Sequence, residues 1–169
     1  MSLTSFDDTR LTAMGLLVEV HCALTSRIDG VLRRHQVSGS DFDVLIRLAR
    51  SRQQSLRLTD LAAQANMSTS GITRVIDRLE RAGLARRTAS DTDRRAYLVV
   101  LTDAGEHRMT TLVPEVGDTI EQWFTGVLAP DRLEAFLATL RAVRDAAHPG
   151  AFAGADDLPA CDPPDDNDP

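Results

Sequence analysis

Apolar residues recur three and four positions apart near the start of the chain, which is the period of one face of an α-helix. The pattern predicts one long helix over residues 8–35. Its apolar members are Leu16, Leu17, Val20, Leu24, Ile28, Val31 and Leu32. The sequence SGS at 38–40 breaks this pattern. Apolar residues at helical spacing predict another helix over residues 41–50. Residues 51–58 are predicted to be a polar link.

The region that follows predicts two short helices joined by a tight turn. Thr59 suits the N-cap of the first helix, and Asn66 suits the left-handed conformation that ends a helix. Ser68 is placed to cap the second helix, residues 69–82, and Gly83 is the expected residue just past its end. Apolar residues at i, i+3, i+4 and i+7 of this helix must face the interior: Ile72, Val75, Ile76 and Leu79.

Two β-prone segments, residues 84–88 and 96–102, stand on either side of the charged sequence ASDTDRR and predict a β-hairpin. Thr102 is placed to cap a helix that runs toward residue 127, and Pro114 is expected to kink or break that helix. Pro130 suits the first turn of a last helix. The apolar stripe of this last helix is Leu133, Phe136, Leu137, Leu140 and Val143. From residue 148 onward, Pro, Gly, Ala and Asp dominate, which predicts disorder.

The net charge of −6 is unevenly distributed. The last twenty residues hold six Asp and no cation, so residues 1–149 are neutral overall, with 19 acidic residues and 19 Arg. Residues 68–95 hold seven Arg against four acidic residues. The middle of the chain is therefore locally basic, and a polyanion such as nucleic acid responds to this local field rather than to the overall charge.

Composition and missing motifs narrow the class of protein. No apolar run approaches the roughly 20 residues that a membrane span needs, and the N-terminus has no basic start or apolar core of a secretion signal. Two distant cysteines, Cys22 and Cys161, form no disulfide framework, which favours a reducing cytoplasm. There is no Walker loop, GxGxxG, nucleophile elbow or HExxH, so we expect no enzyme activity and no cofactor. The scattered histidines predict no metal site.

Two short helices, a tight turn and a hairpin are the parts of a winged helix-turn-helix. If the second helix buries its apolar stripe, small hydroxyls and arginines lie on its other face, and an α-helix fits the major groove of DNA. The candidate DNA-binding residues on this helix are Ser68, Thr69, Ser70, Thr73, Arg74 and Arg78. The alternative is an ordinary solvated face, on which Asp77 and Glu80 neutralise the arginines of their own helix.

Four short sequences in the middle of the chain form a specific set. They are Leu58-Thr59 with Leu61-Ala62, Leu79-Glu80 with Gly83-Leu84, Asp91 with Asp93-Arg94-Arg95, and Leu101-Thr102 with Gly105. With these sequences, residues 58–105 closely resemble the MarR family of bacterial transcriptional regulators. The flanking helices agree with that family in length and order, which extends the resemblance over about residues 8–147.

The resemblance implies a mostly α-helical fold with a small β-hairpin wing, in which long dimerisation helices flank a winged helix-turn-helix. It divides the chain into an N-terminal dimerisation helix (1–37), a DNA-binding domain (38–102), C-terminal dimerisation helices (103–149) and an acidic tail (150–169).

The resemblance also implies roles for residues of the hairpin. Arg94 at its tip would enter a minor groove beside the half-site that the helix from Thr69 reads. Asp93 would orient Arg94 through a charge-assisted hydrogen bond. Arg95 borders the returning strand, where it either touches a phosphate or pairs with an acidic residue of the domain, and Arg86 is a further expected DNA contact.

The function that follows is sequence-specific binding of double-stranded DNA by a homodimer on a pseudo-palindromic operator. We expect a repressor that responds to a small-molecule effector, although no effector-binding residue can be named. The alternative is a winged helix that binds protein instead of DNA. For Cys22, a buried apolar role is favoured over oxidant sensing. The acidic tail is either a solvated end or a segment that competes with DNA for the arginines.

Overall fold

Helices make up most of this computed structural model, which describes residues 8–89 and 97–152. The helices are α1 (Thr9–Arg34), α2 (Gly39–Arg50), α3 (Leu58–Gln64), α4 (Thr69–Arg81), α5 (Asp103–Trp123) and α6 (Pro130–Ala147). The strands β1 (Ser55–Arg57), β2 (Ala85–Ala89) and β3 (Tyr97–Leu101) form an antiparallel sheet in the order β1-β3-β2. Short 3-10 turns are η2 (Arg52–Gln54), η3 (Thr125–Val127) and η4 (Pro149–Phe152). The predicted fold class, mostly helical with a small hairpin, is confirmed.

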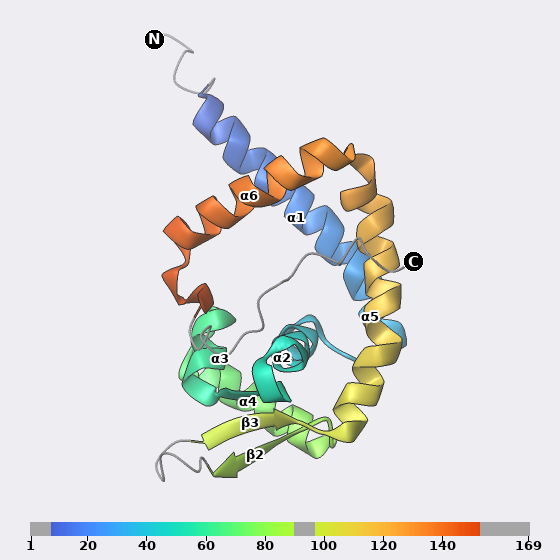
Figure 1. Cartoon of the computed structure of the whole chain (residues 1–169), viewed down its shortest axis with the longest axis vertical. Helices are drawn as coiled ribbons and strands as arrows, with labels where there is room; N and C mark the ends of the chain where they lie inside the picture. The colour runs from blue at the N-terminus through green and yellow to red at the C-terminus, as the bar shows by residue number, and fades with distance from the viewer. Residues whose placement is uncertain (1–7, 90–96, 153–169) are drawn as a thin grey trace, which may run out of the picture.

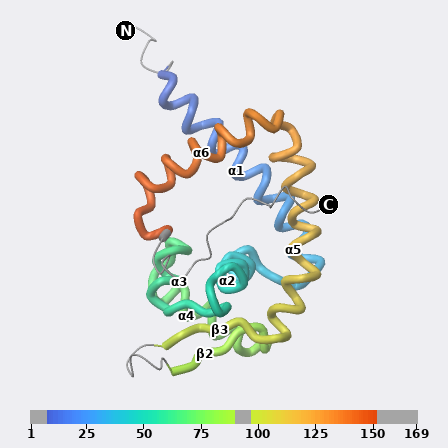
Figure 2. The backbone as a smooth tube through the Cα atoms, viewed as in Figure 1, coloured from blue at the N-terminus to red at the C-terminus, as the bar shows by residue number. Residues whose placement is uncertain are grey.

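The elements form two regions (Figure 1). Helices α2, α3 and α4 gather with the sheet at one end, and α1 and α6 lie at the other. Helix α5 runs between the two ends, and α6 returns from the far end of α5 toward α3, as the backbone tube also shows (Figure 2). The helix-turn-helix unit, which consists of α2, α3, α4 and the sheet, is therefore connected to the long helices through α5, the end of α1 and the turn after α6.

Polar side chains cap the starts of helices α2, α4 and α5. Ser38 and Asp41 form a capping box at α2, in which each side chain accepts the other's backbone N–H. Ser68 accepts the N–H of Gly71 at 3.1 Å at the start of α4, and Thr102 accepts the N–H of Gly105 at 3.0 Å at the start of α5. Each bond satisfies an N–H group that has no acceptor within its helix.

The residues predicted to end helices α3 and α4 behave as expected, whereas the residue predicted to begin α3 does not. Asn66 after α3 and Gly83 after α4 have φ values of 50° and 70°. Helix α3, however, begins at Leu58 with Arg57 as its N-cap, so the assignment of Thr59 as the cap was wrong. The reason is that β1 leads directly into α3, and its last residue already has the extended conformation that an N-cap needs.

Three further expectations are corrected. The predicted polar link contains strand β1, which pairs with β3 and could not be recognised from three residues alone. Helix α5 continues through Pro114, so the predicted break does not occur, and Leu112 and Val116 on either side of the proline are buried. Residues 149–152 form η4 rather than disordered chain, since this turn packs on α3.

The hydrophobic core lies where α2, α3, α4, the sheet and the first half of α5 meet. It is aliphatic, and its fully buried large side chains are Leu32, Val44, Leu45, Leu48, Leu61, Ile72, Ile76, Leu79, Val99 and Leu112. All of these except Leu32 and Leu112 belong to the helix-turn-helix unit and its sheet. The core therefore stabilises the unit that carries α4.

The end of α1 is tied to α5 by a small charged cluster. Glu115 accepts from Arg34 at 3.0 Å and contacts His35 Nε2 at 2.9 Å. Arg34 and His35 lower the pKa of the Glu115 carboxyl. Arg108 Nη1 donates to the backbone oxygen of His35 at 2.7 Å. These contacts fix the direction in which α1 leaves the helix-turn-helix unit.

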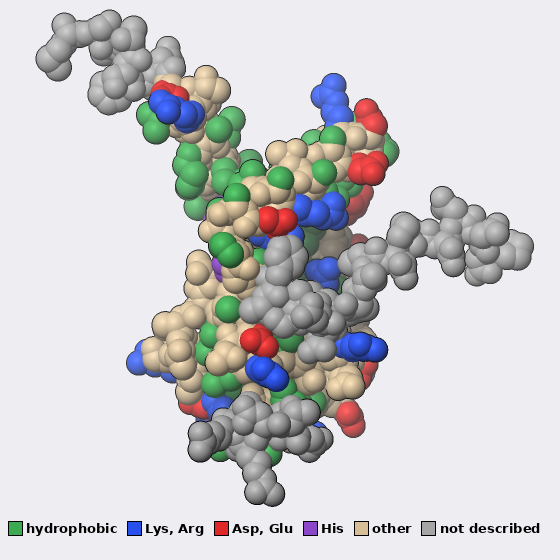
Figure 3. Space-filling view, turned by 60° about the vertical axis from the view of Figure 1, so that its left-hand side comes forward, with side chains coloured by type: hydrophobic (Ala, Val, Ile, Leu, Met, Phe, Trp, Pro, Cys, Tyr) green, Lys and Arg blue, Asp and Glu red, His purple; other side chains and the backbone are tan. Residues whose placement is uncertain are grey.

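The rest of α1 is apolar and exposed. Hydrophobic side chains line its projecting N-terminal half (Figure 3), and Leu16 and Leu17 are 57% and 50% exposed. Among the described helices, α1 alone is long and apolar enough to cross a membrane, with a mean hydropathy of 1.2 over 18 residues. The expectation that no segment approaches a membrane span was therefore wrong, because single polar residues interrupt the apolar stretch without making it hydrophilic.

The close contact between the start of α5 and the turn after α4 can be tested at Gly105. A Cβ atom there would lie 2.1 Å from the carbonyl oxygen of Leu84. Gly105→Ala should lower the free energy of unfolding by about 1–3 kcal/mol, because the backbone must move apart. Gly117→Ala in the same helix is the control, since a Cβ there meets no atom within 4 Å. Urea unfolding measures both, and equal stability of the two variants would contradict this contact.

Candidate nucleic-acid interface

Helix α4 buries one side and exposes the other. The predicted stripe, Ile72, Val75, Ile76 and Leu79, is buried as expected. The opposite side carries Ser68, Thr69, Ser70 and Arg74, which are exposed, and Thr73 and Arg78, which are half-buried. Six of the predicted DNA-binding residues are thus brought to one helix and its N-cap.

The start of α4 is rich in hydroxyl groups. Ser68 Oγ caps the helix and lies 3.2 Å from Ser70 Oγ. Thr73 Oγ1 donates to the backbone oxygen of Thr69 at 2.7 Å and keeps lone pairs free to accept another hydrogen bond. The first N–H groups of an α-helix attract anions. This end of α4 can therefore donate and accept hydrogen bonds at close range.

The two arginines predicted to lie on one face of α4 have different surroundings. Arg74 is exposed and forms no ion pair with another described residue. Arg78 Nε donates to both carboxylate oxygens of Asp41, at 2.8 and 3.0 Å, and its Nη2 donates to Ser40 Oγ at 3.0 Å. The hydrogen bond to Asp41 raises the pKa of Arg78. Arg78 therefore connects α4 to the start of α2, a role that the sequence did not indicate.

The acidic residues of α4 bind a strand instead of their own helix. Arg87 of β2 pairs with Asp77 at 2.7 Å and also with Glu80. Glu80 accepts the backbone N–H of Arg87 at 2.6 Å as well. The alternative in which Asp77 and Glu80 neutralise Arg74 and Arg78 is therefore wrong. These acids fix the hairpin against α4, a role of Arg87 that no local sequence pattern indicates.

The hairpin presents one predicted residue in its described part. Arg86 is exposed on β2 and lies opposite Val100 of β3. The other three predicted residues, Asp93, Arg94 and Arg95, lie outside the described residues, as does Asp91. The last described pair before the tip is Ala89 with Tyr97. The strands of the predicted hairpin are thus confirmed, and the expectations for its tip remain predictions.

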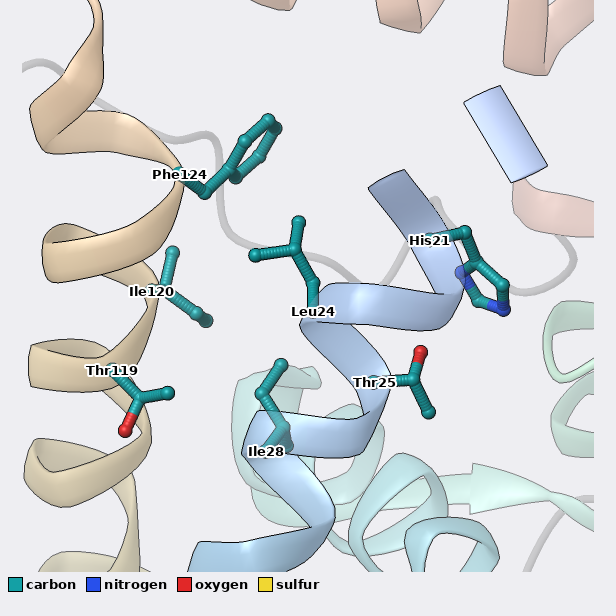
Figure 4. Close-up of a pocket in the computed structure, with 7 residues that line it drawn as sticks. All are labelled: His21, Leu24, Thr25, Ile28, Thr119, Ile120 and Phe124. Atoms are coloured by element: carbon teal, nitrogen blue, oxygen red, sulfur yellow. The ribbon is translucent and has the colours of Figure 1, made fainter. Parts of the chain in front are cut away.

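A cavity of about 280 Å³ lies between α1 and α5, away from α4. Leu24 and Ile28 point from α1 toward Ile120 and Phe124 (Figure 4). His21, Thr25 and Thr119 complete the lining. The apolar walls with a few polar groups at their edges are typical of a site for a small organic molecule.

The structure also bears on the cysteine and on a possible metal site. Cys22 is exposed, so the expectation of a buried cysteine was wrong for the single chain. The reason is that it stands on the projecting part of α1, where no other element of the chain covers it. Within residues 8–89 and 97–152, no group of three or more His, Cys, Asp or Glu side chains is arranged to hold a metal ion.

An outward helix held beside a hairpin defines the class of protein as a winged helix-turn-helix protein. A family model described as the MarR family matches residues 37–97. Together with the fold and the relatives below, this match shows that the middle of the chain is similar to the MarR family.

Three relatives illustrate the similarity. The HTH-type transcriptional regulator PecS of Dickeya dadantii is 28% identical over 106 residues, which cover 62% of this chain and 64% of PecS. The chain thus spans just under two thirds of that relative. The crystal structure of AbsC, a MarR family transcriptional regulator from Streptomyces coelicolor, has a TM-score of 0.76 at 29% identity, covering 82% of this chain and 94% of AbsC. Sco3205, a MarR family regulator from the same organism, was solved in complex with DNA. It has a TM-score of 0.74 at 26% identity, covering 80% of this chain and 86% of Sco3205.

The different surroundings of Arg78 and Arg74 predict different effects on stability. Arg78→Ala should lower the free energy of unfolding by about 1–2 kcal/mol, since it leaves the carboxylate of Asp41, which is 7% exposed, without its cationic partner. Arg74→Ala should change it by less than about 0.5 kcal/mol. Chemical denaturation at neutral pH measures both. If the two variants are equally stable, Arg78 does not hold α4 to α2.

Proposed function

We propose that this protein is a transcriptional regulator that binds double-stranded DNA through α4 and the β2–β3 hairpin. The observation that carries the proposal is the exposed start of α4, where hydroxyls and Arg74 stand on a helix that Arg78 and Arg87 hold from both sides. The similar protein Sco3205 was solved in complex with DNA, which supports the same class of partner.

The predicted DNA-binding residues of α4 divide into those assigned to contact DNA and those that hold the helix in position. We assign Thr69, Ser70 and Thr73 to phosphates or base edges in the major groove, and Arg74 to a guanine edge or a phosphate. Ser68 supports them by capping α4. Arg78, predicted as a contact, is reassigned as a positioning residue because Asp41 and Ser40 already engage its guanidinium group.

The hairpin supplies the remaining contacts of the proposal. Exposed Arg86 is suited to a phosphate. The resemblance of the sequence to the family is the basis for the expected minor-groove contact of Arg94, with Asp93 orienting it and Arg95 beside it. A narrow, A·T-rich minor groove would favour such an arginine.

We further propose that the protein acts as a homodimer. No residue of α6 is buried in the single chain, and the apolar side chains of α1 are largely exposed. A large exposed apolar surface needs a partner. A second copy fits better than a membrane, because Ile28 packs against the core and the cluster at Glu115 ties the end of α1 to α5.

The regulatory action proposed here is steric repression in the cytoplasm. A dimer on a promoter palindrome excludes competing proteins from that DNA. The cavity between α1 and α5 is the proposed site for a small-molecule effector, since a molecule there would change the angle between the two helices. Leu24 and Ile120 would contact its apolar part.

The second candidate function is a winged helix that binds protein. Arg81, Arg86 and the acidic Asp77 on the exposed surface would suit a charged protein partner. DNA binding is distinguished from it by salt dependence, because the affinity for a duplex falls with a log–log slope of about −0.9 for each phosphate contacted. Arg74 is exposed and has no carboxylate partner within residues 8–89 and 97–152, which favours DNA.

DNA recognition is tested at Arg74. On a duplex selected from a random library by this protein, Arg74→Ala should weaken binding by about 1–3 kcal/mol, because it removes a groove contact. Arg132→Ala, an exposed arginine on α6, is the matched control and should bind like the natural protein. Fluorescence anisotropy at several salt concentrations measures both. If no duplex is selected, or binding is independent of salt, the protein-binding alternative is favoured.

Dimerisation is tested on α1. Leu17→Asp places a charge on the exposed apolar face and should convert the dimer to monomer at micromolar concentration. Ser26→Asp adds the same charge on the opposite side of the helix and should leave the dimer intact. Sedimentation velocity measures both. A stable dimer of the Leu17→Asp variant would contradict the role of this face.

A further inference from the structure

The end of α6 is attached to the helix-turn-helix unit. His148 Nε2 lies 2.8 Å from the backbone oxygen of Ala63 in α3. Turn η4 packs on the same helix, and a Cβ atom on Gly150 would lie 3.3 Å from that oxygen. Figure 1 shows the return of α6 to α3. The chain beyond residue 152 therefore starts beside the unit that carries α4.

The chain beyond this point is strongly acidic. Residues 153–169 contain six Asp and no Arg or Lys. These residues lie outside the described part of the chain, and their charge follows from the sequence alone. Six like charges in seventeen residues repel one another, so they favour a surface of opposite charge.

Such a surface lies on α4 and β2. Arg74 and Arg86 are exposed and form no ion pair with a described residue. Exposed Arg81 donates to the backbone oxygen of Asp77 and likewise forms no ion pair within the described part of the chain. Arg78 and Arg87, in contrast, are held by carboxylates of the folded unit. The arginines without a carboxylate partner among the described residues are the ones that an additional anionic segment would bind.

The length of the acidic segment is sufficient for this contact. A chain of seventeen residues can span up to about 56 Å, while α4 with its thirteen residues is about 20 Å long. Tethering at such distances gives effective concentrations in the millimolar range. Even weak ion pairing is then enough to populate the contact at low salt.

We propose that residues 153–169 bind the exposed arginines of α4 and β2 and compete with DNA for this surface. The competition rests on the proposed function, whereas the binding of the segment to α4 does not. The arginine face would be covered by the protein's own aspartates until a duplex with more closely spaced charges displaces them. A solvated tail, or a tail that only repels DNA at long range, would not touch α4.

The contact is tested with the full-length protein and a nitroxide label on Cys161, after Cys22→Ser removes the other thiol. At low salt, the amide signals of α4 should broaden in nuclear magnetic resonance spectra. Replacing all six aspartates of the segment by asparagine in the labelled protein should abolish the broadening. If α4 shows none, or shows the same broadening in the asparagine variant, the proposed contact is overturned.

The competition is tested with the same six substitutions in the unlabelled protein. At about 50 mM salt, the asparagine variant should bind the selected duplex at least threefold more tightly, and the difference should vanish above about 0.3 M salt, where ion pairs are screened. Broadening of α4 with unchanged affinity would overturn the competition. If no duplex binds either protein, the proposed function fails, while the spectra still test the contact.

Discussion

Burial of one side of α4 determines what the other side can contact. Ile72, Val75, Ile76 and Leu79 enter a core shared with α2, α3 and the sheet. A rotation of the helix by one residue would expose part of this stripe and bury a polar group such as Thr73 or Arg74 without a partner, which is costly. The exposed hydroxyls and Arg74 therefore follow from the packing of the opposite face.

Three arginines on or beside this helix illustrate how one residue type takes different roles. Arg78 links α4 to α2 through Asp41, and Arg87 links it to β2 through Asp77 and Glu80. Arg74 has no such carboxylate partner among the described residues. Because the chain contains no lysine, residue type alone could not separate the arginines that hold α4 in place from those available to bind DNA. The partners in space make that distinction.

Features that depend on neighbouring residues were predictable from the sequence. Ser68, Asn66 and Gly83 act within one turn of their own position, so their roles followed from local chemistry. The pairing of Arg78 with Asp41 joins residues 37 positions apart, and no periodic pattern indicates it. Strand β1 and the attachment of His148 to Ala63 likewise depend on elements distant in sequence.

In the proposed homodimer, two copies of α4 would bind two half-sites related by a twofold axis. Hydroxyl-radical footprinting of the complex with a selected duplex tests it most directly. We expect two symmetrical protected regions whose centres lie about 34 Å apart, or one turn of the double helix. A single asymmetric footprint, or no protection at saturating protein, would contradict it.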